Sequence, residues 1–241
     1  AIKGGAMVGL FRGLLDLVFP PTCKVCGRQS KQTLCDRCMD SFPKIDGSIC
    51  LKCGKPCQRE VGSCRECAHK TLHFSRARSA GIYAGSLKEA VHQLKYKNGK
   101  RLSPHLARFI LGVAGDFIDD IIHDIDVIAC VPLSRYKEAK RGYNQSRLIA
   151  QELSVSLNKP LSNCLIKTHT TPEQNKLGLA DRPRNIKGAF AVKSPIYGKV
   201  LLIDDVYTTG STVSECARVL LQAGAEEVFV LTVARTPFAG G

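Results

Sequence analysis

Cysteines are the residues whose type and spacing most clearly predict chemistry in this chain. The 241 residues include 12 cysteines, and nine of them lie between Cys23 and Cys67. Eight of the nine form four C-x-x-C pairs, namely Cys23/Cys26, Cys35/Cys38, Cys50/Cys53 and Cys64/Cys67. A C-x-x-C turn directs two thiolates at one point, and two such turns complete a tetrahedral Zn²⁺ site. The spacing therefore predicts two structural four-cysteine zinc sites.

The sequence alone leaves open which two C-x-x-C pairs share a zinc ion. In a sequential grouping, Cys23/Cys26 join Cys35/Cys38 and Cys50/Cys53 join Cys64/Cys67. Sequential grouping closes shorter loops than a cross-braced arrangement does, so loop entropy favours it. Cys57 and His69 are near enough in sequence to replace a ligand of the second site, but we interpret them as bystanders. A disulfide framework is the alternative to zinc, and it is disfavoured because no secretory signal accompanies the pairs.

The stretch from Val200 to Thr212, VLLIDDVYTTGST, predicts a second kind of site. Its four aliphatic residues are typical of a buried strand, and they end at two adjacent carboxylates, Asp204 and Asp205. The Thr-Thr-Gly-Ser-Thr turn then offers N–H groups, hydroxyls and a helix N-terminus, which suit a phosphate dianion. Carboxylates suit vicinal sugar hydroxyls and, through water, Mg²⁺, so the stretch predicts a sugar-phosphate site. Alternatively, Asp205 and Ser211 serve only as turn and N-cap residues.

Two basic runs could supply the cations that a sugar pyrophosphate needs. The first holds Lys95, Lys97, Lys100 and Arg101, and the second holds Arg135, Lys137, Lys140, Arg141 and Arg147. Either run could instead be a solvated face. Arg141 points more strongly to function, because the sequence Arg-Gly-Tyr-Asn-Gln joins a bidentate donor to a flexible glycine.

Hydrophobic periodicity after residue 78 predicts the elements that position these groups. Strands are expected at 80–84, 127–131, 165–166, 189–192, 200–203 and 227–234. Helices are expected at 87–94, at 102–122 with a break near 112–115, at 145–157 and at 211–223. Such alternation predicts an α/β fold, with a mostly parallel sheet and ligands at the carboxyl ends of its strands.

The cysteine spacing and this periodicity divide the chain into three parts. Residues 1–19 are interpreted as a tag remnant, with Met7 as the natural start, followed by an amphipathic helix that ends before Pro20-Pro21. Residues 20–78 form the predicted double zinc module, and residues 79–241 form the α/β domain.

The Val200–Thr212 stretch closely resembles the PRPP-binding motif of type I phosphoribosyltransferases. Joined to a multi-cysteine zinc module, it makes the chain similar to the ComF family of competence-associated phosphoribosyltransferase-like proteins (ComFC and its GntX relatives). The resemblance runs from about Leu10 to Arg235 and includes Leu94-Lys95-Tyr96-Lys97, Val131-Pro132-Leu133, Arg141-Gly142-Tyr143-Asn144-Gln145 and the segment from Gln174 to Asn185. It implies a type I phosphoribosyltransferase-like sheet with helices on both faces.

The resemblance also implies roles for individual residues. Asp204 and Asp205 would hold the ribose hydroxyls of PRPP, and together with Arg141 they would be the catalytic residues. The remaining PRPP contacts would come from Val206, Tyr207, Thr208, Thr209, Gly210, Ser211, Thr212, Pro132, Leu133, Ser134 and Lys97. A mobile loop from about 168 to 182, with Thr171, Gln174 and Arg182, would close over the site.

The implied function is transfer of a phosphoribosyl group from Mg²⁺–PRPP to an acceptor that no motif specifies, within the uptake or processing of transforming DNA. Pyrophosphate would leave, an oxocarbenium-like C1′ would be trapped by a nitrogen nucleophile, and Asp205 is a candidate base. A different class is a non-catalytic, PRPP-sensing protein that binds single-stranded DNA. A third is an adaptor whose zinc module docks a helicase or uptake component.

Net charge predicts an anionic partner. The chain has 35 Lys+Arg against 21 Asp+Glu, a formal charge of +14. Two four-cysteine zinc sites would each contribute about −2, lowering the total to roughly +10. No run approaches the roughly 20 apolar residues of a spanning helix, and no secretory signal is seen, so we expect a cytoplasmic protein without a membrane span.

Overall fold

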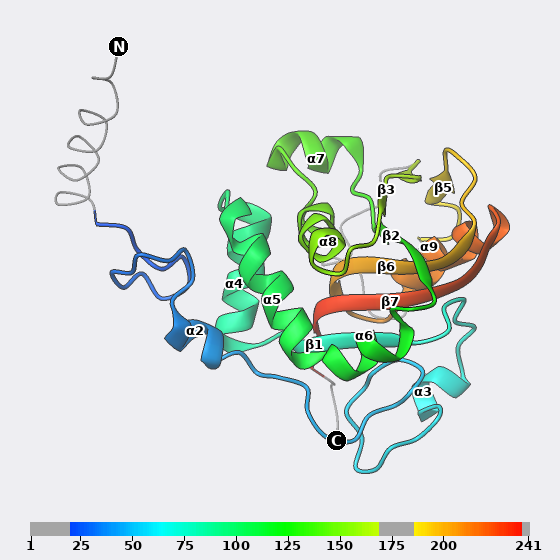
Figure 1. Ribbon diagram of the computed structural model, residues 1–241, viewed down its shortest axis with the longest axis horizontal. Helices are drawn as coiled ribbons and strands as arrows, with labels where there is room; N and C mark the ends of the chain where they lie inside the picture. The colour runs from blue at the N-terminus through cyan, green and yellow to red at the C-terminus, as the bar shows by residue number, and fades with distance from the viewer. Residues whose placement is uncertain (1–19, 169–185, 238–241) are drawn as a thin grey trace.

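The computed structural model describes residues 20–168 and 186–237 (Figure 1). Its helices are α2 (Asp36–Asp40), α3 (Arg65–Ala68), α4 (Gly85–Tyr96), η1 (Lys100–Leu102), α5 (Ser103–Val113), α6 (Gly115–Ile121), α7 (Arg135–Arg141), α8 (Gln145–Ser156) and α9 (Ser211–Gln222). Its strands are β1 (Ala77–Ile82), β2 (Ile125–Cys130), β3 (Leu161–Ser162), β4 (Leu165–Lys167), β5 (Phe190–Val192), β6 (Gly198–Tyr207) and β7 (Ala225–Arg235). None of the described helices is long and apolar enough to cross a bilayer.

Five of these strands form one parallel sheet in the order β1-β7-β6-β2-β3. β4 and β5 form a separate antiparallel pair. The parallel α/β architecture predicted from the sequence is thus confirmed, with the Cys-rich module in front of it.

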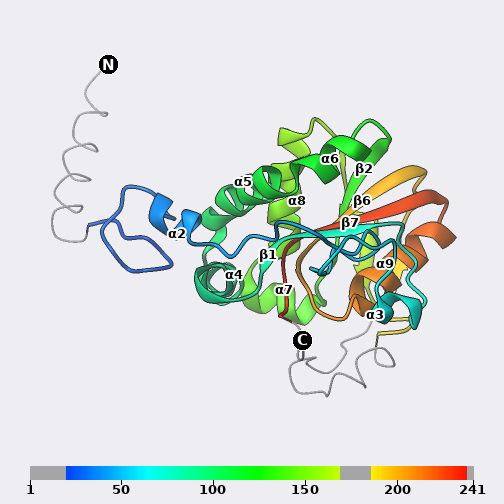
Figure 2. The ribbon, with the colours of Figure 1, turned by 90° about the horizontal axis from the view of Figure 1, so that it is seen from below.

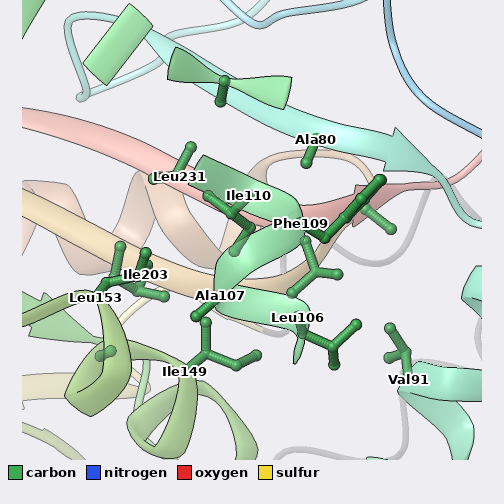
Figure 3. Packing of buried hydrophobic residues seen from close by; sticks show 14 of the residues in the cluster. Ala80, Val91, Leu106, Ala107, Phe109, Ile110, Ile149, Leu153, Ile203 and Leu231 are labelled. Atoms are coloured by element: carbon green, nitrogen blue, oxygen red, sulfur yellow. The ribbon is translucent and has the colours of Figure 1, made fainter. Parts of the chain in front are cut away.

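The sheet is covered on both faces, which is why its central strands β6 and β7 contain the continuous apolar runs 200–203 and 228–231. Along β6, Leu201 and Ile203 face one core while Val200 and Leu202 face the other. Helices α5, α6 and α8 lie on the first face and α9 on the second (Figure 2). Figure 3 shows the first core, where Ile110 of α5 and Ile149 of α8 gather near Ile203.

The two halves of the Cys-rich module lie on opposite faces of this sheet. The first half contributes Cys23, Leu34 and Cys38 to the core beside α4, whereas the second contributes Cys50 and Phe74 to the core beside α9. The connecting residues run antiparallel along the edge strand β1, where Ile45 N–H donates to the carbonyl of Ala80 at 2.9 Å. The chain therefore crosses from one face to the other at this edge.

Five short elements were absent from the sequence-based expectations, namely α2, α3, η1, α7 and β3. The basic segment after Ser134 forms the short helix α7, which Ser134 caps by accepting the N–H of Lys137. The two-residue strand β3 adds the outer edge of the sheet. The predicted amphipathic helix before Pro20 lies outside the described residues.

Candidate functional site

The eight predicted cysteine ligands gather into two four-sulfur groups. Cys23, Cys26, Cys35 and Cys38 form the first centre, and Cys50, Cys53, Cys64 and Cys67 form the second, with the Sγ atoms of each centre within 4.8 Å of one another. Sequential grouping is therefore confirmed, and neither centre includes Cys57 or His69. Four thiolates at this spacing fit a structural Zn²⁺ ion.

The centres repeat one local design. In the first, the N–H of Cys35 donates to Cys23 Sγ at 3.4 Å. In the second, the N–H of Cys64 donates to Cys50 Sγ at 3.2 Å. Such N–H···S bonds orient the thiolates and partly neutralise the charge of a four-sulfur site.

The two adjacent aspartates lie within β6 and not beyond its end, because β6 continues to Tyr207. Asp204 Oδ1 accepts from Ser146 Oγ at 2.8 Å and from the N–H of Asp205 at 2.9 Å. Asp204 is nevertheless buried beside a second carboxylate. Burial and then the charge of Asp205 raise the pKa of Asp204 to about 7.

Lys95 of α4 reaches across to the second carboxylate. Its Nζ lies 2.9 Å from Asp205 Oδ1, and the two side chains are only 16% and 6% exposed. Burial would lower the pKa of Lys95, but the Asp205 carboxylate outweighs it and raises that pKa. Asp205 Oδ2 is buried without a hydrogen-bond partner among the described residues. A buried carboxylate oxygen without a partner can accept a hydrogen bond from a hydroxyl or amine group of a bound ligand.

The predicted Arg-Gly-Tyr-Asn-Gln motif ties four elements together around these carboxylates. Arg141 Nη1 donates to Gln145 Oε1 at 2.8 Å. Gly142 ends α7 with φ +75°. Tyr143 Oη donates to the carbonyl of Leu94 at the end of α4. Asn144 caps α8 and also donates to the carbonyl of Val131 at 2.9 Å. The motif thereby fixes Ser146, the donor to Asp204.

The tight turn after β6 and the first two residues of α9 form the predicted phosphate-binding segment, which we call the phosphate loop (residues 208–212). Gly210 has φ +79°, a conformation that other residues rarely adopt. A Cβ at Gly210 would lie 2.2 Å from Tyr207 Oη, so the loop closes against the tyrosine hydroxyl. Thr209 Oγ1 and Ser211 Oγ lie 2.8 Å apart and bond to each other.

One cavity of about 590 Å³ brings most of the predicted site residues together. Its lining includes Asp204, Asp205, Val206, Tyr207, Thr208, Gly210, Thr212, Pro132, Leu133, Ser134 and Arg141. Thr209 and Ser211 line a second cavity of about 460 Å³ instead. Lys97 is exposed and does not line the first cavity, whereas Lys95 does. Thr171, Gln174 and Arg182 lie outside the described residues.

The structure gives Lys95, Ser146 and Lys167 roles that were not predicted from the sequence. Lys95 was expected among the cations for a sugar pyrophosphate and within the stretch Leu94-Lys95-Tyr96-Lys97, but its pairing with Asp205 was not. Ser146 directly follows the Arg-Gly-Tyr-Asn-Gln motif, so its position beside the site could have been inferred. Lys167 of β4 lines the cavity together with Phe190 of β5, and nothing local in the sequence indicates that the β4–β5 pair reaches this cavity.

Comparison with known proteins places the chain among relatives of similar length. A family model described as "Double zinc ribbon domain" matches residues 14–68. "DNA utilization protein YhgH" of Escherichia coli is 32% identical over 224 residues, covering 89% of this chain and 90% of the relative. "Competence protein F" of Haemophilus influenzae is 32% identical and covers 93% and 94%. "Competence protein ComFC" of Bacillus subtilis is 27% identical and covers 80% of each chain.

Among solved structures, a purine phosphoribosyltransferase from Pyrococcus horikoshii aligns with 15% identity and a TM-score of 0.33. The alignment covers 56% of this chain and 90% of that structure, and such a weak likeness supports no conclusion. The full-length similarity to YhgH and competence protein F, together with the double zinc ribbon, is decisive: the chain belongs to the ComF family.

Proposed function

We propose that the protein binds Mg²⁺–PRPP and acts as a phosphoribosyltransferase-like component of a DNA uptake or DNA utilisation pathway. The observation that carries the proposal is a single cavity that joins two buried aspartates, a glycine-turned phosphate loop and several cations. The names of the relatives, which refer to competence and DNA utilisation, support the assignment to such a pathway.

The carboxylates match the ribose end of PRPP. Asp205 Oδ2, buried and without a described partner, would accept a ribose hydroxyl. Lys95 holds the other oxygen of the same carboxylate and so fixes its orientation. Asp204 and Asp205 are also the carboxylates that would reach Mg²⁺ through water. When bound, that ion would neutralise charge on the departing pyrophosphate.

The phosphate loop matches the 5′-phosphate. It includes the first two residues of α9, a helix of 12 residues, so the N-terminal N–H groups and the helix dipole favour an anion there. Thr208, Gly210 and Thr212 line the cavity from this loop. These loop residues and the two carboxylates line the same cavity, as the two ends of one bound ribose 5-phosphate would require.

The cations around the rest of the cavity match the pyrophosphate. Lys95, Lys137, Arg141 and Lys167 line it, against Asp204 and Asp205 as its only acidic lining residues in the described chain. In the reaction, the bond between C1′ and the pyrophosphate oxygen would break, and a nitrogen nucleophile of the acceptor would form the new bond to C1′. Fixed cations would stabilise the negative charge that develops on the leaving group.

Isothermal titration calorimetry with Mg²⁺–PRPP tests binding, and pyrophosphate release tests turnover. Wild-type protein should bind, and Asp205→Asn should weaken binding by about tenfold or more, since a charged hydrogen-bond acceptor is lost. The exposed Asp119→Asn in α6 is the matched control and should bind as wild type does. No binding by the wild type, or equal binding by Asp205→Asn, contradicts the proposal.

A second candidate function, binding of single-stranded DNA, is favoured by a cleft next to the first cavity. Tyr96, Tyr136 and Tyr143 line this cleft of about 290 Å³ together with Lys95, Lys137, Lys140 and Arg141, and no acidic residue of the described chain lines it. Tyr96 and Tyr136 are 53% and 66% exposed, and the Arg141 guanidinium stacks over the Tyr96 ring at 4.7 Å. Exposed aromatic rings among cations are what single strands bind by stacking and charge.

Tyr136→Ala tests this second function. We expect weaker binding of a labelled single-stranded oligonucleotide, by about fivefold or more, because base stacking is lost. Tyr197→Ala is the matched control, since Tyr197 is 73% exposed but lies outside the cleft. Equal losses in the two variants would count against the cleft, as would an affinity that does not change with salt.

A further inference from the structure

The second cysteine centre lies beside the phosphate loop, and the segment that follows it is bonded to that loop. Lys70, three positions after Cys67, donates from Nζ to the carbonyl of Thr209 at 3.4 Å. The N–H of His73 donates to Ser214 Oγ at 3.1 Å, and Ser214 Oγ donates to the carbonyl of Thr71 at 3.5 Å. Residues 70–73 are thus joined both to the loop and to the first turn of α9.

A buried set of contacts joins the same centre to the loop from below. Arg235, only 1% exposed, donates from Nη1 to the carbonyl of Cys53 at 2.8 Å. Its guanidinium lies 5.0 Å from the ring centre of Tyr207, and the Phe74 ring meets Tyr207 edge-on at 6.4 Å. Tyr207 Oη in turn supports Gly210. Contacts are therefore continuous from a zinc ligand to the backbone of the phosphate loop.

The first centre is attached to a different part of the molecule. Ser86, in the first turn of α4, donates from Oγ to the carbonyl of Ser41 at 3.0 Å. Phe42 packs edge-on against Phe109 of α5 at 5.0 Å. The segment of the first centre is residues 20–42. Within the described ranges 20–168 and 186–237, its hydrogen bonds to the rest of the chain go to Ser86 of α4 and not to the phosphate loop. The views of Figures 1 and 2 agree, with α2 beside α4 and α3 on the side of α9.

We propose that the second centre positions the phosphate loop, so that metal binding at Cys50, Cys53, Cys64 and Cys67 and phosphate binding at residues 208–212 are thermodynamically linked, with Tyr207 and Arg235 as positioning residues. This inference rests on the proposed function, because it takes the loop to be the phosphate site. Loss of the metal would free residues 68–74 and remove the contacts at Thr209, Ser214 and Tyr207. Ligand binding would then have to order the loop, which lowers affinity.

Ser214→Ala and Ser86→Ala form a matched pair that tests the linkage with both metals in place. Each removes one hydroxyl, in the first turn of a helix, that donates to the carbonyl of a zinc segment. Ser214→Ala should weaken binding of Mg²⁺–PRPP and of inorganic phosphate by about threefold to tenfold, the worth of one or two hydrogen bonds. Ser86→Ala should bind as wild type does. Arg235→Lys should behave like Ser214→Ala while retaining two zinc ions per chain.

Because linkage is reciprocal, PRPP must also change the metal affinity of the second centre, which can be measured without any assay of activity. Competition with a chelator, followed by thiol alkylation and mass spectrometry, reports metal loss at each centre separately. Saturating Mg²⁺–PRPP should raise the metal affinity of the second centre by the same factor by which metal there raises PRPP affinity, and leave the first centre unchanged. If wild-type protein binds PRPP but the two serine variants weaken it equally, or both centres respond alike, the linkage is wrong and the proposed function stands. Failure of wild-type protein to bind PRPP or phosphate overturns both.

Discussion

Asp204 shows how much one buried residue of the site affects the stability of the molecule. Its carboxyl accepts two hydrogen bonds, yet burial beside Asp205 still raises its pKa to about 7, above the ordinary value of 3.8. Between those two pH values, the folded protein keeps a proton on Asp204 that the unfolded chain releases. This carboxyl therefore contributes a loss of stability as pH rises from about 4 to about 7.

Asp204→Asn should remove that loss. In the absence of PRPP and Mg²⁺, the free energy of unfolding of the variant should exceed that of the wild type at pH 8 by on the order of 2–4 kcal/mol, and the difference should shrink towards pH 4. Urea denaturation at several pH values measures it. The exposed Asp119→Asn is the control. A variant whose stability follows the wild-type pH curve would show that Asp204 is ionised throughout.

Lys95 and Lys97, two positions apart in the same motif, should differ sharply in their contribution to stability. Lys95 is paired with a buried carboxylate, whereas Lys97 is exposed at the end of α4. Lys95→Met leaves Asp205 buried without its cation, which should cost on the order of 3 kcal/mol at pH 8. Lys97→Met should cost within about 0.5 kcal/mol. Chemical denaturation of both variants decides it, and similar stabilities would mean that the Lys95–Asp205 ion pair is weak.

At the scale of elements, the turn between β6 and α9 makes a demand that only glycine meets. Gly210 and Gly142 share nearly the same positive φ, +79° and +75°. A Cβ would meet nothing within 4 Å at Gly142, but would lie 2.2 Å from Tyr207 Oη at Gly210. Both Gly→Ala variants should lose about 1 kcal/mol to backbone strain. Only Gly210→Ala should also weaken Mg²⁺–PRPP binding, by about tenfold or more, because the loop must move off Tyr207.

Calorimetric measurement of Mg²⁺–PRPP affinity for Gly210→Ala and Gly142→Ala separates the effect of backbone strain from the effect of a displaced phosphate loop. Equal PRPP affinities would show that the phosphate loop tolerates the shift. Equal losses of affinity would show that unfolding, and not loop geometry, is responsible.

Most elements could be predicted from the sequence because their periodicity is local. The buried strands β2, β6 and β7, and the break between α5 and α6, all follow from apolar runs and glycines. Helix α7 was missed because its residues are charged and none of them is buried, so no apolar stripe marks it. β3 has only two residues and depends on β2 for its pairing.

The site was predictable in the same way, since only the parts that are local in the sequence could be identified. Residues adjacent in sequence, such as Asp204 and Asp205, were identified by motif. Their partners came from other elements, as with Lys95 of α4 and Ser146 of α8. Which lysine of a run turns inward depends on helix phase and on the depth of the neighbouring strand, and neither is contained in a count of charges.

At the scale of the whole molecule, the zinc ribbons and the α/β domain share their cores. One centre packs on each face of the sheet, and the connection between them pairs with the edge strand β1. The boundary drawn from the sequence at residue 79 falls inside β1 (Ala77–Ile82). Removing the ribbons would expose apolar surface on both faces, leave the β1 edge unpaired and deprive buried Arg235 of the Cys53 carbonyl.

A chain that begins at Ala77 should therefore fail to fold as an independent domain. We expect it to be aggregation-prone and to lack a cooperative thermal transition, although it retains every strand of the parallel sheet. Removing zinc from the full chain with a chelator should act in the same direction and lower the melting temperature, because seven of the eight ligand cysteines, all but the exposed Cys26, lie in or against the two cores. Circular dichroism melts and nitrogen–proton correlation spectra measure both. A cooperative melt with dispersed resonances from the shortened chain would show instead that the α/β domain is autonomous, and would leave the ribbons as a separate module whose role is confined to binding.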